Sequence, residues 1–244
     1  MYKDFLFKSR AKTTALATAA ALVLSGLGGA VSAATYDFRA IANGAGFTDS
    51  TNTARPGGEA DWNTRVGAGV GILDVGTGIS VVGSATTSAQ SSILAYFDGG
   101  AGLGACSVVT ASGQCNPAND DNVGAIGGSA NAGDGTFETL LLTFSETVKL
   151  TGMQFRAEGH GLFNGSVKIN GIATAIAGGA WSGPLIGSVF SFEYIPVAST
   201  AGSTNEFYIG TATVSPIPVP AAGVLLFTAL AGGAAFGHRR KTRA

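Results

Sequence analysis

The chain has 244 residues, of which 45% are hydrophobic and only 12% charged, and 38 are glycine. This apolar content excludes a disordered chain, and the glycines follow no three-residue period, which excludes a collagen-like repeat. The net charge is −1, but eight of the 14 basic residues lie in two terminal segments. Between those segments, residues 34–214 carry six basic and 14 acidic side chains, a formal charge of −8. Such an acidic body disfavours nucleic acid and other polyanions as partners, because their binding needs a basic patch.

Residues 1–33 have the pattern of a secretory signal peptide. An apolar stretch of small residues, 13–27, follows positive charges at Lys3, Lys8, Arg10 and Lys12. Val31-Ser32-Ala33 then forms a small-residue cleavage site before Ala34, and a cut after Ala34 fits nearly as well. An uncleaved membrane helix is the alternative, which the short, Ala-rich apolar stretch disfavours. We therefore expect export, with cleavage at Ala33 or Ala34.

The body, residues 34–214, alternates apolar and polar residues as half-buried strands do. In 188–194 this alternation puts Phe190, Phe192 and Tyr194 on one face. Asn170-Gly171 predicts a two-residue type I′ hairpin, and Gly152 is the natural site for a bulge. The expected strands are 35–41, 69–75, 79–84, 91–97, 137–144, 148–156, 166–170, 172–176, 188–194 and 206–214. Short strands joined by Gly-rich turns predict an all-β domain, a β-sandwich or a jelly roll.

Cys106 and Cys115 are the only cysteines. In an exported chain, an isolated pair in a polar loop predicts a disulfide. A zinc site is the alternative, but it needs further ligands, and the body has one histidine, His160. We expect the disulfide to pin a loop.

The densest group of oxygen-bearing side chains follows directly, at Asn116, Asn119, Asp120, Asp121 and Asn122. Ca²⁺ takes six to eight oxygen ligands, so Asp120, Asp121 and Asn122 are candidate calcium ligands. The spacing does not fit an EF-hand, and Asn and Asp are common in loops because they form turns. Turn formation is the more frequent role, and no cofactor is required by the sequence.

Catalytic motifs are missing from the sequence. There is no G-x-S-x-G, P-loop, G-x-G-x-x-G or H-E-x-x-H, and a Ser-His-Asp triad would depend on His160 alone. Glycoside hydrolysis needs only two carboxylates, but no acidic pair is distinguished by its context. Trp62 and Trp181 are able to stack on sugars, although core packing is the more common role. We expect a protein that is not an enzyme.

Residues 215–244 form a three-part C-terminal segment. Three prolines at 216, 218 and 220 give a stiff extended stretch, 216–221. The uncharged residues 221–237 span roughly 25 Å as a helix, against about 30 Å of hydrocarbon. A basic tail, 238–244, follows with Arg239, Arg240, Lys241 and Arg243, which the positive-inside tendency holds in the cytoplasm. An ordinary C-terminal membrane anchor is the alternative reading.

Ile217-Pro218-Val219-Pro220-Ala221, the apolar helix and the basic end resemble the sorting signal of PEP-CTERM proteins, in the variant written Val-Pro-Leu-Pro-Ala. The commonest form has an acidic residue between the prolines, where this chain has Val219. The resemblance implies export by a Gram-negative bacterium and cutting at the proline motif by an exosortase in the inner membrane. Residues 102–123 and the segments around 141–145 and 150–156 are also similar to a β-rich ectodomain of such proteins, which has no established activity.

Together these features predict a noncatalytic cell-surface or extracellular-matrix protein. It is expected to pass the inner membrane, meet an exosortase there, and associate outside the cell with exopolysaccharide or other surface material. Two alternatives stay open: a Ca²⁺-dependent carbohydrate-binding module and a polysaccharide-active hydrolase.

Overall fold

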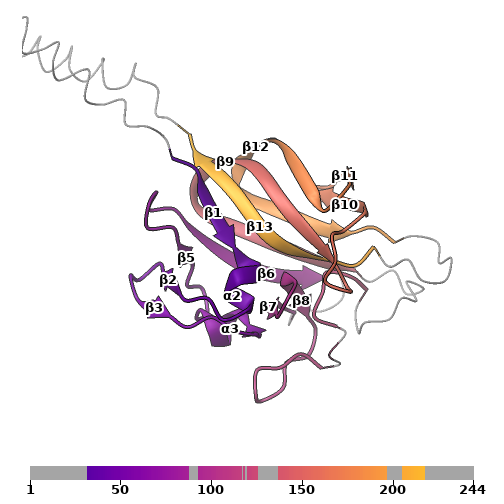
Figure 1. The fold of residues 1–244 in the computed structure, drawn as a ribbon, viewed down its shortest axis with the longest axis horizontal. Coiled ribbons are helices and arrows are strands. Elements are labelled where there is room, and N and C mark those ends of the chain that lie inside the picture. The colour runs from indigo at the N-terminus through magenta and orange to yellow at the C-terminus, as the bar shows by residue number, and fades with distance from the viewer. Residues whose placement is uncertain are drawn as a thin grey trace, which may run out of the picture. The chain divides into compact units, whose positions relative to one another are not determined.

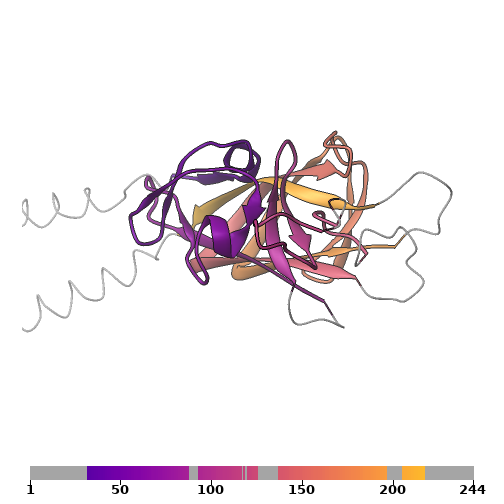
Figure 2. The ribbon, with the colours of Figure 1, turned by 90° about the horizontal axis from the view of Figure 1, so that it is seen from below.

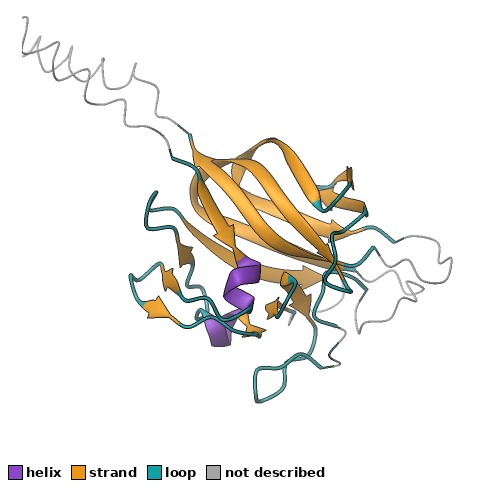
Figure 3. Ribbon diagram, viewed as in Figure 1, coloured by secondary structure: helices purple, strands orange, loops and turns teal. Residues whose placement is uncertain are grey.

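The computed structural model describes residues 32–87, 93–116, 118, 120–125, 137–196 and 205–217. Strands account for 58% of these residues and helices for 6%, so the protein is all-β, as the sequence predicted (Figure 3). The chain divides into two compact units, Met1–Val31 and Ser32–Ala244, and every described residue belongs to the second.

The described residues form one antiparallel sheet with two short helices, α2 (Phe38–Ala42) and α3 (Trp62–Arg65). In chain order the strands are β1 (Ala34–Asp37), β2 (Phe47–Asp49), β3 (Ala54–Arg55), β4 (Ala60–Asp61), β5 (Ile72–Leu73), β6 (Ser80–Thr87), β7 (Leu94–Asp98), β8 (Gly102–Cys106), β9 (Glu138–Ala157), β10 (Gly165–Ile169), β11 (Ile172–Ile176), β12 (Ala180–Tyr194) and β13 (Phe207–Pro216).

Strand β9 has 20 residues and pairs with three other strands, β6, β12 and β13. The strand order is β3-β2-β5-β6-β9-β13-β8-β7-β4, with β1 beside β13, β12 beside β9, and β10 between β11 and β12. The first half of β9 pairs with β6 and the end of β12, whereas its second half pairs with β13 and the start of β12.

The sheet curls around one hydrophobic core. Phe192 on β12 pairs with Leu140 in the first half of β9, yet its ring lies 6.2 Å from that of Phe155 in the second half. In a straight strand, Leu140 and Phe155 would be about 50 Å apart. The two halves of β9 therefore bend toward each other over a shared interior, and both ribbon views show this curvature (Figure 1, Figure 2).

Several local expectations from the sequence are confirmed. Phe190, Phe192 and Tyr194 are all buried, on one side of β12. Asn170 and Gly171 have φ values of 50° and 77°, as a type I′ hairpin between β10 and β11 requires. The pairing of β9 with β13 shifts register next to Gly152, the expected bulge site.

Other expectations were wrong in extent. The strand expected at 35–41 stops at Asp37, because the Asp37 carboxylate accepts the amide of Ala40 at 2.8 Å and starts α2. The strand expected at 69–75 shrinks to β5, because Asp74 Oδ1 accepts the amides of Gly76 and Thr77 and begins a turn. The strands expected at 137–144 and 148–156 are one strand, β9, since no Gly or Pro interrupts the exposed residues 145–147.

The first and last strands lie side by side, so both ends of the described body leave at one place (Figure 1). Ala34 is buried and pairs with Val214, whereas Ala33 is exposed. Strand β13 runs to Pro216, two residues past the expected domain end, because a proline is tolerated at a strand terminus. Ile217 is partly exposed; residues 218–221, the expected helix 221–237 and the four basic tail residues lie outside the described residues. Within the described residues, no helix is long and apolar enough to cross a bilayer.

Candidate functional site

A disulfide between Cys106 and Cys115 closes the loop after β8, as the sequence predicted. The two Cα atoms are 5.8 Å apart, and both side chains are buried. The chain-entropy model gives about 2.5 to 3 kcal/mol for closing a loop of this size. The disulfide holds the entry to residues 120–125 against the sheet.

Residues 120–125 are wedged between two parts of the sheet. Val123 exchanges two backbone hydrogen bonds with Phe207, and the Gly124 carbonyl accepts the amide of Glu138 at 3.0 Å. Gly104 on β8 makes room for this segment, because a Cβ there would lie 2.0 Å from the Asp121 carbonyl oxygen. The acidic residues expected in an open loop are therefore held inside the fold.

Asp120 and Asp121 face different partners. The Asp120 carboxylate accepts the amide of Ser107 at 3.0 Å and also the Ser107 hydroxyl. The Asp121 carboxylate accepts the Tyr208 hydroxyl at 2.5 Å, and burial raises its pKa. The two neighbouring carboxylates thus do not converge on one point.

Glu138 and Glu206, which flank this segment, are almost fully buried, with 1% and 2% of their surface exposed. Burial, followed by the nearby charge of Asp120, raises the pKa of Glu138 well above its usual range. Burial and then the charge of Glu158 raise the pKa of Glu206 to about 7. Neither residue stands out in the sequence, although Glu138 is the first residue of β9 and Glu206 directly precedes β13.

A histidine–carboxylate pair lies nearby. His160, in a turn with φ of 60°, places Nε2 2.9 Å from Asp98 Oδ2, and its ring packs edge-on against Tyr208 at 6.0 Å. Burial raises the pKa of Asp98 to about 7, and the charges of Asp121 and Glu59 add to this. The structure therefore brings His160 to Asp98, a contact that their separation by 62 positions hides in the sequence.

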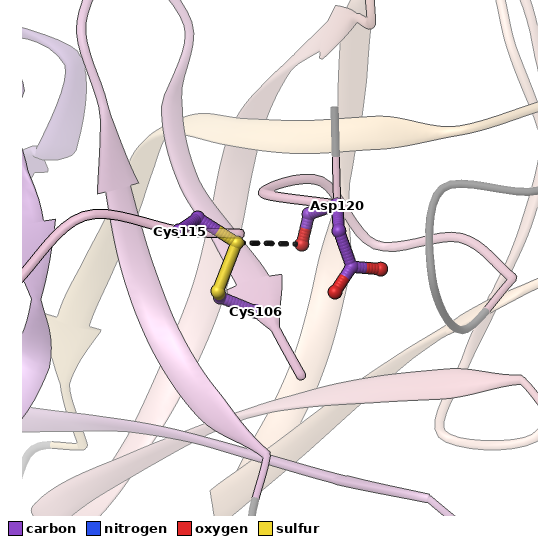
Figure 4. Close-up of side chains that lie close together, drawn as sticks. All are labelled: Cys106, Cys115 and Asp120. Atoms are coloured by element: carbon purple, nitrogen blue, oxygen red, sulfur yellow. Dashed lines mark hydrogen bonds between the residues drawn. A yellow bond between two sulfur atoms is a disulfide. The ribbon is translucent and has the colours of Figure 1, made fainter. Parts of the chain in front are cut away.

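Three potential ligand side chains meet at the disulfide: Cys106, Cys115 and Asp120 (Figure 4). Within the described residues, only this group of three has its ligand atoms within 4.8 Å of one another. Both sulfurs are bonded to each other, so neither is a thiolate ligand. Cys115 Sγ lies 3.2 Å from the Asp120 carbonyl oxygen, a packing contact, and an Asp120 carboxylate oxygen lies within 4.8 Å of both sulfurs (Figure 4).

The remaining sequence candidates are scattered. Asn122 is buried beside the glutamates, Asn116 is exposed, and Asn119 lies outside the described residues. Trp62 is buried in the core with its ring stacked 5.2 Å from that of Phe97, and Trp181 is half-buried against the core. Both tryptophans therefore pack in or against the hydrophobic core, which was the more common role expected of them.

The fold defines an antiparallel all-β protein with one disulfide and a buried acidic group at one end of the sheet. Comparisons with known protein families, with curated proteins and with solved structures find no match.

Proposed function

We propose that this chain is an exported, noncatalytic cell-surface or matrix protein of the PEP-CTERM type, cut by an exosortase at Ile217-Pro218-Val219-Pro220-Ala221. The observation that carries the proposal is the three-part segment 215–244, with its proline motif, its uncharged stretch and its basic end. In this proposal residues 1–33 are the signal peptide, residues 221–237 cross the inner membrane, and the curled sheet is a β-sandwich ectodomain.

Two structural features support the proposal. Strand β1 starts at Ala34, next to the expected signal cleavage, and β13 ends at Pro216, next to the expected exosortase motif. Both cuts would then fall at the edge of the folded body and leave the pairing of β1 with β13 intact. A surface role also suits a body with a formal charge of −8 in which a disulfide closes the loop after β8.

Association with exopolysaccharide is the extracellular role that we propose for the body. We place such contact at the end of the sheet opposite Ala34 and Val214, which lies about 30 Å away along β13 and so away from the two processing sites.

The processing step is tested by expressing the full chain in bacteria with and without an exosortase and measuring the intact mass of the exported protein. With the enzyme, we expect a species that lacks Val224–Ala244. A Pro218→Ala, Pro220→Ala double variant should keep the C-terminal segment, whereas Pro196→Ala, the same change outside the motif, should be processed normally. A C-terminal segment that stays attached in cells with an active exosortase contradicts the proposal.

A further inference from the structure

Two buried glutamates near Asp120 each have one oxygen atom without a hydrogen-bond partner among the described residues. These atoms are Oε1 of Glu138 and Oε1 of Glu206. Polar atoms taken out of water are nearly always paired, since an unpaired one loses its hydration without compensation. Two such oxygens on neighbouring buried carboxylates are able to accept a proton or to bind a cation.

The side chains concerned gather around Gly124. The Gly124 amide donates to Glu138 Oε2 at 3.1 Å. A Cβ at Gly124 would lie 2.7 Å from Asn122 Oδ1 and 2.6 Å from Glu206 Cγ. A glycine is therefore required here, and its small size lets the three side chains approach each other from three different segments.

Asp120 adds a further negative charge to this group. Its carboxylate acts on both Glu138 and Glu206 and raises the pKa of each. Because the fold buries Glu138 and Glu206 next to a further carboxylate, and no salt bridge among the described residues reaches either glutamate, the repulsion between these charges has to be offset in another way.

We propose that Glu138, Glu206, Asp120 and Asn122 form a binding site for a hard divalent cation, with Ca²⁺ as its occupant. The ligands on offer are all oxygens, which Ca²⁺ prefers and accepts in flexible geometry. Mg²⁺ demands near-ideal octahedral geometry and keeps several waters, which a buried site of this kind does not favour. Zn²⁺ prefers nitrogen and sulfur, and both cysteines are in the disulfide.

This ligand set differs from the one that the sequence suggested. Asp121 is left out because its carboxylate faces the Tyr208 hydroxyl and its charge is not among those that act on Glu206, whereas the charge of Asp120 acts on both glutamates. Glu138 and Glu206 enter from other segments of the chain. The three carboxylates do not have their oxygens within 4.8 Å of one another, so the ion must draw the glutamate side chains inward. Calcium binding should consequently tie together residues 120–125, the start of β9 and the start of β13.

The test uses the exported, disulfide-bonded protein, freed of metal with a chelator and kept at neutral pH. We expect calorimetric titration with CaCl2 to show binding of one ion per chain, and thermal melting to show a rise in Tm that saturates with CaCl2. MgCl2 at the same concentration should give a smaller rise. No heat and an unchanged Tm in CaCl2 would overturn the proposal, and would mean that protons alone neutralise the glutamates.

Two variants assign the site. Glu138→Gln and Glu206→Gln keep the side-chain shape and remove a charge, so each should fold, melt at or above the wild-type Tm without metal, and lose the calcium-dependent rise. Glu146→Gln, which removes an exposed charge from the same strand as Glu138, should respond like the wild type. Equal calcium responses in all three variants would refute the site.

A second measurement keeps the test decisive if a variant does not fold. Tb³⁺ replaces Ca²⁺ in oxygen sites, and Tyr194 is close enough to Glu206 for that carboxylate to raise its pKa. Terbium luminescence excited through tyrosine should therefore appear in the wild-type protein and disappear when CaCl2 is added. Luminescence that CaCl2 does not displace would contradict the assignment.

Discussion

At the scale of single residues, the chemistry of this protein is concentrated in carboxylates that the fold buries. Asp98 ends the otherwise apolar strand β7 and lies beside His160, Tyr208 and Asp121. Burial and two neighbouring acids raise its pKa to about 7, so the folded protein holds this proton more tightly than the unfolded chain does. Stability from this group is therefore fully present below the unfolded pKa of about 4 and is lost as the pH rises through 7.

We expect the metal-free protein to melt at a higher temperature at pH 5 than at pH 8. Asp98→Asn should reduce this difference and raise the Tm at pH 8, because asparagine keeps the side-chain shape beside His160 but carries no charge near Asp121 and Glu59. Melting curves of both proteins across this pH range measure the effect. A wild-type Tm that rises from pH 5 to pH 8, or an unchanged pH dependence in the variant, contradicts it.

At the scale of elements, Trp62 packs so closely against β6 that even one added methyl group on that strand would clash. Gly83 on β6 lies against Trp62, whose ring is stacked on Phe97 and whose Nε1 donates to the Val70 carbonyl at 3.0 Å. A Cβ at Gly83 would lie 2.7 Å from that ring. The indole is fixed on two sides and buried, so it cannot move aside.

Gly83→Ala should lower the free energy of unfolding by about 1 to 3 kcal/mol, the usual cost of overpacking a core. Gly152→Ala is the matched control, since its Cβ would meet nothing closer than 3.8 Å and it lies in a strand of the same sheet. Denaturant unfolding of the two variants separates them. Equal losses at both positions would show that the cost comes from losing a strand glycine rather than from Trp62.

At the scale of the whole molecule, the two ends of β13 have different roles. Its last residues, near Ala34, lie where the chain enters and leaves the body, and its first residues lie beside the buried acids. In the proposed function the end of the body near Ala34 and Val214 faces the membrane during sorting, and the end with the buried acids faces away from it. Because β13 pairs with β1, β8 and β9, the body depends on this strand.

A chain that ends after Ile217 should therefore keep the wild-type Tm, because no described strand is shortened. A chain that ends after Tyr208 loses most of β13 and should not fold. Circular dichroism melting of both exported proteins tests this. A large loss of stability in the first truncation would mean that the sorting segment contributes to the folded body, and would argue against its removal in the mature protein.

Local patterns in the sequence were sufficient for much of the sheet. Alternation identified the buried faces of β10 and β12, and Asn170-Gly171 identified the hairpin between β10 and β11, because both signals depend on neighbouring residues only. They were not sufficient for the length of β9 or for the early turn into α2. Those outcomes depend on the core into which β9 bends and on the side-chain cap at Asp37.

The sequence by itself determined the all-β class, the disulfide and the motifs that suggest export and sorting, since composition, cysteine number and linear order carry that information. Only the tertiary structure decided which acids meet. Glu138, Glu206 and Asp98 lie far from Asp120 along the chain, and a carboxylate's partners are set by how the sheet curls, not by spacing in the sequence. Burial then turns these ordinary surface residue types into a group that needs a proton or a cation to be stable in the fold.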